Sequence, residues 1–109
     1  MIPLIEIVKE EIPFDGFAVE ESRKGYSVDI AEVRNLLGRD IPLFGNVDIK
    51  FLEKASREEI LNEAKRQIQA AGAGTPFILC TGSPQTFETT AENLRIFCES
   101  TRILAEAER

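Results

Sequence analysis

The hydrophobic residues of this chain fall into alternating helical and extended segments. Ile5, Val8 and Ile12 recur at positions i, i+3 and i+7, which predicts a helix over residues 3–11 that stops at Pro13. Further along the chain, short apolar runs alternate with amphipathic stretches of helical period. The pattern as a whole therefore predicts a mixed α/β fold.

Three further helices are predicted to begin at capping signals, in which Asp, Ser or Thr is followed three residues later by Glu. The three pairs are Asp29 and Glu32, Ser56 and Glu59, and Thr89 and Glu92. The first two of these helices are expected to end at Gly38 and Gly72, and the third to run nearly to the C-terminus. Their predicted buried stripes are Ile30, Val33, Leu36 and Leu37; Ile60, Leu61, Ala64, Ile68 and Ala71; and Leu94, Phe97, Cys98, Thr101, Leu104 and Ala105. A short turn of helix is also expected within residues 48–55.

Three short apolar runs between the helices are typical of strands, at residues 14–20, 41–47 and 76–80. The alternation of helix and strand favours a parallel sheet with right-handed helical crossovers. Strand starts near residues 14, 41 and 76 lie 27 and 35 residues apart, which brackets the roughly 31 residues per unit of an eightfold (β/α) barrel. Three strands cannot close a barrel. We therefore expect residues 1–109 to form a single domain that is part of such a barrel.

Composition narrows the possible functions. The 109 residues carry 13 Lys and Arg against 19 Asp and Glu, a net charge of −6, with no basic cluster, so nucleic acid is not an expected partner. The chain has no histidine, which excludes imidazole catalysis. No apolar run approaches the roughly 20 residues of a membrane span, and the N-terminal segment is interrupted by charge. We expect a cytoplasmic protein that is not bound to a membrane.

The two cysteines, Cys80 and Cys98, stand 18 residues apart without a CxxC motif, which favours reduced thiols. A thiolate at Cys80 could bind zinc, but no nearby second cysteine and no histidine exist to complete a tetrahedral site. Zinc is therefore not expected. Cys98 lies on the predicted apolar stripe of the last helix and is interpreted as a small core residue.

The candidate functional residues are those that come directly after the predicted strands, because functional groups of parallel α/β folds gather beyond the carboxyl ends of their strands. Glu20 and Glu21 follow the first strand. One of them could act as a general base or bind a cation, or both could be solvated charges, since consecutive strand residues point opposite ways. Asn46 and Asp48 follow the second strand. They could hydrogen-bond a polar ligand, or Asp48 could cap the short helix after it.

The third candidate segment is the Thr-Gly-Ser-Pro turn at residues 81–84. Its glycine, Gly82, and its hydroxyl groups, including that of Ser83, lie ahead of a helix start and resemble an anion-binding turn. The alternative is that these side chains only cap the helix.

Five segments carry a resemblance to known proteins, at residues 16–20, 43–48, 77–79, 82–84 and 89–95. Together they resemble the C-terminal end of the uroporphyrinogen decarboxylase superfamily. The superfamily comprises tetrapyrrole decarboxylases and cobalamin-linked methyltransferases that act on coenzyme M or on methoxylated and methylamine-type substrates, and its members are TIM barrels. The resemblance spans nearly the whole chain and implies the C-terminal portion of a TIM barrel, about three parallel strands with covering helices.

The chain also departs from this superfamily. Decarboxylases commonly have a histidine in the region of Gly82 and Ser83, and zinc-dependent methyltransferases have a ligand cysteine at about Ser83, where this chain has serine. The N-terminal half of the superfamily, with its substrate-holding arginine and aspartate and its first zinc ligands, has no counterpart here. The loop at residues 20–25 and the turn at residues 82–84 are closer to the methyltransferase-like branch.

The resemblance implies a part in corrinoid-linked methyl transfer or tetrapyrrole decarboxylation within a larger or assembled barrel. The implied substrate-binding residues are Glu20, Asn46, Asp48, Gly82 and Ser83, and a corrinoid is the possible cofactor. The alternative function is a non-catalytic partial barrel that self-associates or docks on a partner to cover its open edges. With either function, we expect a homo-oligomer or a complex with the missing barrel half.

Overall fold

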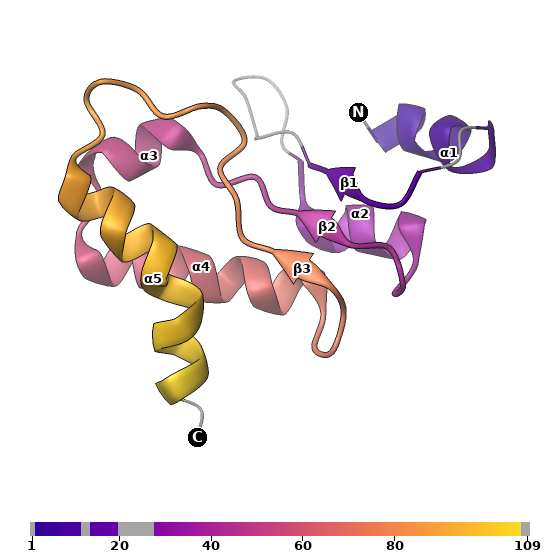
Figure 1. Cartoon of the computed structure of the whole chain (residues 1–109). Helices are drawn as coiled ribbons and strands as arrows, with labels where there is room; N and C mark the ends of the chain where they lie inside the picture. The colour runs from indigo at the N-terminus through magenta and orange to yellow at the C-terminus, as the bar shows by residue number, and fades with distance from the viewer. Residues whose placement is uncertain (1, 12–13, 20–27, 108–109) are drawn as a thin grey trace.

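The computed structural model describes residues 2–11, 14–19 and 28–107, and helices and strands alternate along them (Figure 1). The helices are α1 (Ile2–Glu11), α2 (Ile30–Leu37), α3 (Ile49–Lys54), α4 (Arg57–Ala71) and α5 (Ala91–Ala107). The strands are β1 (Phe17–Ala18), β2 (Leu43–Phe44) and β3 (Phe77–Ile78). Each strand lies within its predicted run but is only two residues long. Among the described helices, none combines the length and the apolar character needed to cross a membrane.

The three strands form one parallel sheet in the order β1-β2-β3. Two rows of side chains cross it in register, Phe17, Leu43 and Phe77 on one face and Ala18, Phe44 and Ile78 on the other. Three parallel strands with covering helices confirm the predicted fold class, a partial TIM barrel.

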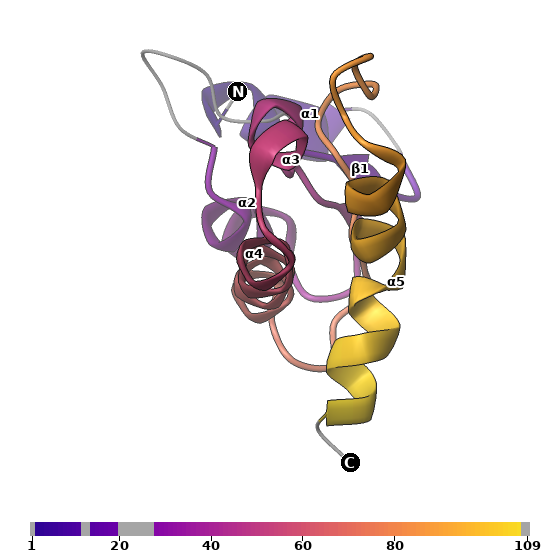
Figure 2. The same cartoon turned by 90° about the vertical axis from the view of Figure 1, so that its left-hand side faces the viewer.

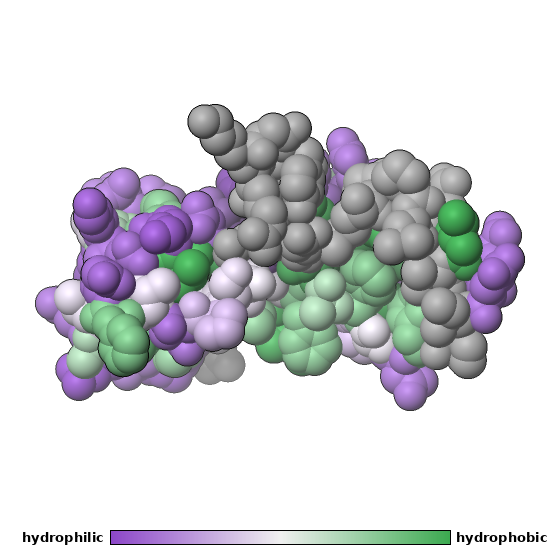
Figure 3. Space-filling view, turned by 90° about the horizontal axis from the view of Figure 1, so that it is seen from above, coloured by the Kyte–Doolittle hydropathy of each residue, from purple (hydrophilic) through white to green (hydrophobic). Residues whose placement is uncertain are grey.

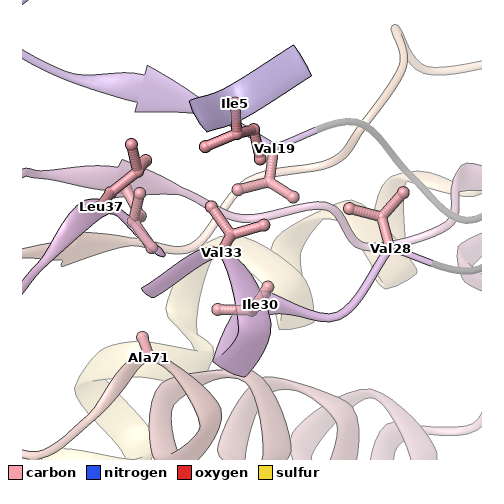
Figure 4. Packing of buried hydrophobic residues seen from close by; sticks show 8 residues of the cluster. Ile5, Val19, Val28, Ile30, Val33, Leu37 and Ala71 are labelled. Carbon is pink, nitrogen blue, oxygen red and sulfur yellow. The ribbon is translucent and has the colours of Figure 1, made fainter. Parts of the chain in front are cut away.

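One face of the sheet is covered by helices. In Figure 1, α2 lies behind the strands, and α2 and α4 pack against each other. Leu43 and Val19 are buried there against Ile5 of α1 and Val33 of α2 (Figure 4). A second core fills the space between α3, α4 and α5, and α5 crosses beside α4, which is seen nearly end-on in the turned view (Figure 2).

The opposite face of the sheet is largely uncovered among the described residues, and α5 borders it only beside β3. Phe44 and Ile78, which belong to the same row, are 36% and 49% exposed. In the space-filling view, hydrophobic colour gathers near the middle of the molecule, in the region of the strands (Figure 3). Parallel sheets are normally covered on both faces. We call this row, Ala18, Phe44 and Ile78, the open face.

Capping decides where two of the helices begin, as predicted. Asp29 accepts a hydrogen bond from the backbone N–H of Ala31 at 3.0 Å and so caps α2. Ser56 and Glu59 form the complete capping box of α4, with reciprocal bonds of 3.2 and 3.0 Å. The hydrogen bonds that Glu59 makes with the Ser56 backbone and side chain lower the pKa of its carboxyl.

The last helix, α5, begins one residue later than predicted. Its cap is Thr90, whose Oγ1 accepts from the backbone N–H of Asn93 at 3.1 Å. Thr89 was the predicted cap, but its Oγ1 is instead 3.2 Å from that of Thr86. The Thr89 hydroxyl, which the pattern predicted to cap the helix, therefore makes a contact within the loop before α5.

The predicted buried stripe of α5 is wrong in part. Ile96 and Ser100 are buried, whereas Cys98 and Thr101 are exposed. The reason is that α5 packs on α3 and α4 through the side that carries Ile96. The interpretation of Cys98 as a core residue is therefore wrong. A similar shift occurs in α4, where the fully buried polar residue is Gln67.

A buried arginine joins the elements at the amino-terminal edge of the sheet. Arg34 is buried, with only 6% of its surface exposed. Its guanidinium donates to four carbonyl oxygens, those of Ala71 (2.8 Å), Gly38 (3.1 Å), Ile41 (2.6 Å) and Pro76 (2.8 Å). These carbonyls lie at the ends of α2 and α4 and just before β2 and β3. One side chain therefore holds two helices and two strands in place.

The electrostatics of this site favour a cation. Carbonyl groups at the C-terminal ends of helices carry partial negative charge, and the ends of α2 and α4 both face Arg34. Burial lowers the pKa of Arg34, and the nearby charge of Arg39 lowers it further. An arginine nevertheless stays protonated in a protein, so all four bonds are charge-assisted.

Replacing Arg34 with methionine should be severely destabilising. The Arg34→Met change keeps much of the aliphatic volume but leaves four carbonyl groups without their donor. We expect the free energy of unfolding to fall by about 3 kcal/mol or more, since one hydrogen bond to a charged group contributes roughly 1.5–3 kcal/mol. Urea unfolding followed by circular dichroism measures this loss.

The matched control is Arg39→Met, which removes one exposed hydrogen bond of 3.0 Å to the carbonyl oxygen of Ala73. It should change the free energy of unfolding by less than about 1 kcal/mol. Similar losses for the two variants would show that the Arg34 contacts do not hold the fold together.

Candidate functional site

The segments that follow β2 and β3 lie side by side at the carboxyl edge of the sheet. Val47 and Thr81 form a parallel bridge. The backbone N–H of Val47 donates to the carbonyl of Cys80 at 3.0 Å, and that of Gly82 donates to the carbonyl of Val47 at 3.0 Å. These bonds place residues 46–48 beside residues 81–83. We call the two segments together the mouth.

Four of the five predicted binding residues lie on the mouth. They are Asn46, Asp48, Gly82 and Ser83. The fifth, Glu20, lies outside the described residues, as does Glu21. The strand order thus brings together candidates that are more than 30 residues apart in the sequence.

Asn46 is built into the scaffold of the mouth. The residue is 7% exposed, and its Nδ2 donates to the carbonyl oxygen of Val28 at 3.0 Å. Its backbone N–H donates to Oε1 of Gln67 at 3.4 Å. Asn46 therefore links β2 to α4 and to the segment that leads into α2. Its part in substrate binding stays a prediction.

Asp48 caps α3, as the alternative interpretation of the sequence proposed. Its Oδ1 accepts from the backbone N–H of Lys50 at 2.9 Å. The residue is exposed. The Asp48 side chain is thus held at the edge of the mouth by the N-terminus of α3.

The turn at residues 81–83 offers hydroxyl groups rather than helical amides. Residues 84–90 separate it from α5, and the N–H of Gly82 is engaged by the Val47 carbonyl. Thr81 Oγ1 donates to the carbonyl oxygen of Ser83 at 2.8 Å and braces the turn. Neither hydroxyl caps α5, because Thr90 does so. The half-buried Ser83 side chain is the polar group that this turn brings to the mouth.

The loop between the turn and α5 is anchored on α3. Thr86 Oγ1 donates to Oε1 of Glu53 at 2.5 Å. Asn93 Nδ2 donates to the carbonyls of Leu52 and Ala55 at 2.9 and 3.1 Å. The fully exposed Phe87 is therefore presented on a loop with fixed ends.

Sequence reasoning missed Gln67, a buried polar residue next to the mouth. It is 1% exposed and lies on α4 between Ala64 and Ala71, which are also buried. Its Nε2 donates to Oε1 of Glu63 at 3.2 Å. The spacing 64, 67 and 71 is helical, so a stripe drawn through these positions instead of through Ile68 would have found it.

Glu63 is held in its charged form at the other end of this hydrogen-bond chain. Burial raises the pKa of Glu63, but hydrogen bonds from Arg66 and Gln67 and the charge of Arg66 outweigh that effect and lower the pKa overall. The Glu63 carboxylate is thus an acceptor at neutral pH.

The side chains near the mouth do not form a metal centre. No three His, Cys, Asp or Glu side chains lie close enough to hold a metal ion in the part of the chain that the structure describes. Cys80 is half-buried and Cys98 is exposed, and both are free thiols.

An apolar groove of about 450 Å³ lies away from the mouth, between β3 and α5. It is lined by Phe77, Ile78, Leu79, Phe97, Cys98 and Thr101. The groove continues the open face at Ile78, and the residues wrongly assigned to the core of α5 line its helical wall. The open face and the groove together form one apolar surface beside the last strand.

Comparison with known protein families finds a match over most of the chain. The family model for uroporphyrinogen decarboxylase (URO-D) matches residues 2–103. The chain belongs to the uroporphyrinogen decarboxylase family. The match includes all three strands and both segments of the mouth, and it confirms the superfamily resemblance drawn from the sequence. A search of curated proteins finds no significant match.

Gly45, which precedes Asn46, should tolerate no side chain. A Cβ atom there would lie 2.6 Å from Oε1 of Gln67 and 2.8 Å from the ring of Phe77. We expect Gly45→Ala to lower the free energy of unfolding by about 1–3 kcal/mol, the usual cost of overpacking a tight site. Thermal and urea unfolding measure the change.

Gly16→Ala is the matched control. A Cβ atom at Gly16 would meet its nearest neighbour at 3.5 Å, an ordinary contact. Its effect should lie within about 1 kcal/mol of zero. If Gly45→Ala were equally mild, the close packing of Gln67 against β2 would be refuted.

Proposed function

We propose that this chain supplies part of the substrate-binding mouth of a uroporphyrinogen decarboxylase-like barrel that is larger than the chain or assembled from more than one. The reaction would be corrinoid-linked methyl transfer or tetrapyrrole decarboxylation. The observation that carries the proposal is the Val47–Thr81 bridge, which joins two candidate segments within the stretch matched by the family. Reactive groups of (β/α) barrels gather at this edge.

The open face supports a role inside a larger barrel. Barrel interiors are filled by layers of apolar side chains that alternate strands contribute. Phe44 and Ile78 lie on the face of the sheet opposite α1 and α2, as interior residues of a barrel do, yet they are exposed. Further (β/α) units, or a partner chain, would cover them.

The mouth residues have distinct proposed roles. The Asp48 carboxylate would accept hydrogen bonds from N–H groups, which tetrapyrroles and methylamine-type substrates both carry. The Ser83 hydroxyl, braced by Thr81, would bind an anionic or polar group of the substrate. Asn46 and Gly82 would hold the two segments at a fixed separation, and Glu20 would help to orient the substrate.

We favour the methyltransferase-like branch, because the loop at residues 20–25 and the turn at residues 82–84 resemble that branch more than the decarboxylases. A corrinoid supplies the methyl-carrying chemistry of that branch when it is bound. The described residues do not fit as its holder, since the chain has no histidine and the described part has no cluster of metal ligands. A corrinoid, where used, would be held by residues outside the described part of the chain. The free thiols support a cytoplasmic setting.

The Ser83→Ala change tests the proposed mouth in the assembled protein. Cobalamin and a porphyrinogen-like tetracarboxylate are titrated separately as probes. We expect affinity for the probe that binds to fall about tenfold, the loss of roughly 1.4 kcal/mol from one hydrogen bond, with an unchanged unfolding midpoint. Asn62→Ala, an exposed change on the outer side of α4, is the control and should leave both quantities unchanged. A drop in stability that matches the drop in affinity would contradict the proposed role of Ser83.

The second candidate function is a non-catalytic partial barrel that self-associates or docks on a partner. The continuous apolar surface formed by the open face and the groove favours it. Sedimentation velocity combined with probe titration separates the two functions. Self-association without binding of either probe would support this alternative. A stable monomer at micromolar concentration that binds no probe would refute both.

A further inference from the structure

We propose that Gln67 is a positioning residue, which acts on the mouth through Asn46. The inference rests on the proposed function of the mouth. Gln67 belongs to α4, on the helical side of the sheet, and does not itself lie on either mouth segment. Its influence on a ligand would therefore pass through β2.

A hydrogen bond and close packing fix Gln67 against the backbone just after β2. The residue is 1% exposed, and its Oε1 accepts from the backbone N–H of Asn46 at 3.4 Å. The missing side chain at Gly45 leaves the space that Oε1 occupies, since a Cβ atom there would be 2.6 Å away. A buried amide in a site shaped for it has a specific partner, because an unpaired one would be costly.

Glu63 sets the orientation of the Gln67 amide. Its carboxylate accepts from Nε2 of Gln67 at 3.2 Å and cannot donate when ionised. Nε2 must therefore point toward Glu63, and Oε1 toward the N–H of Asn46. Arg66 donates to the same carboxylate, at 3.0 Å to its Oε2, and holds it in place. The ion pair of Glu63 and Arg66 on α4 thus determines that Oε1 of Gln67, and not Nε2, faces the backbone of Asn46.

Asn46 carries this constraint into the mouth. With its backbone N–H held by Gln67, its side chain reaches the carbonyl of Val28 at 3.0 Å. Val47, the next residue, makes the bridge to Thr81. The chain of contacts thus runs from Glu63 through Gln67 and Asn46 to the paired strand ends.

Gln67→Met tests the proposal, because it keeps the length and volume of the side chain but removes both hydrogen bonds. In the assembled protein, the backbone amide resonance of Asn46 should shift upfield, and its hydrogen exchange should become at least about tenfold faster. Affinity for the bound probe, cobalamin or the tetracarboxylate, should fall about threefold to tenfold. Gln69→Met, an exposed change on the same helix, is the control and should alter none of these.

Two further variants separate positioning from general destabilisation. Glu63→Ala leaves Gln67 in place but removes the partner that orients it, so it should shift the Asn46 amide in the same direction. Glu63→Ala combined with Gln67→Met should weaken probe binding no more than Gln67→Met alone, because Glu63 acts on the mouth only through Gln67.

These measurements separate a failure of the positioning role of Gln67 from a failure of the proposed function of the mouth. If neither probe binds but the Asn46 amide shifts in both variants, the proposed function fails while the contact between Gln67 and Asn46 stands. An unchanged Asn46 amide in Gln67→Met, or strictly additive losses of affinity in the double variant, would overturn the positioning role.

Discussion

The guanidinium of Arg34 holds together the amino-terminal edge of a sheet whose strands are too short to form a stable sheet through their own hydrogen bonds. Each strand contributes two residues, so few ladder hydrogen bonds link them. Arg34 compensates by donating to carbonyls before β2 and β3 and at the ends of α2 and α4. Because these acceptors are neutral, the charge is stabilised by helix ends and by carbonyl groups rather than by an ion pair. The helices are thereby fixed relative to the strands that they cover.

The carboxyl edge of the sheet is organised differently. Polar contacts of Asn46, Asp48 and Thr81 hold two short segments in place, and the buried Gln67 supports one of them from behind. The contacts that stabilise the fold thus lie at the amino-terminal edge of the sheet, and the candidate binding residues lie at the carboxyl edge. The same separation is known from (β/α) barrels. We propose that further polypeptide covers the open face between the two edges, since exposed apolar rows on a parallel sheet are unusual.

Local signals in the sequence predicted much of this fold. The caps at Asp29 and Ser56, the stop at Gly72 and the three apolar runs mark elements whose causes lie within a few residues, and the structure has them. The mouth was also predictable in part, because strand ends in a parallel sheet must meet at one edge. Family membership was visible in the order and spacing of the same segments.

The remaining features depend on neighbours that no local pattern reveals. Arg34 is buried although polar because carbonyl groups far along the sequence accept its hydrogen bonds. Gln67 is buried because it pairs with the distant backbone N–H of Asn46 as well as with Glu63 on its own helix. Cys98 was assigned to the core because helical spacing shows which residues share a side, but not which side the next helix contacts. The engagement of the Gly82 N–H by Val47 likewise follows from the sheet and not from the turn sequence.

The central claim is that further polypeptide covers the open face in the working protein. Hydroxyl-radical footprinting of the protein at its native concentration tests it most directly, with the fully exposed Phe87 as an internal reference. The account predicts that Phe44 and Ile78 are labelled far more slowly than Phe87, and that this protection disappears when the assembly is dissociated. Labelling of Phe44 and Ile78 at the rates expected for their 36% and 49% exposure in the single chain would contradict it.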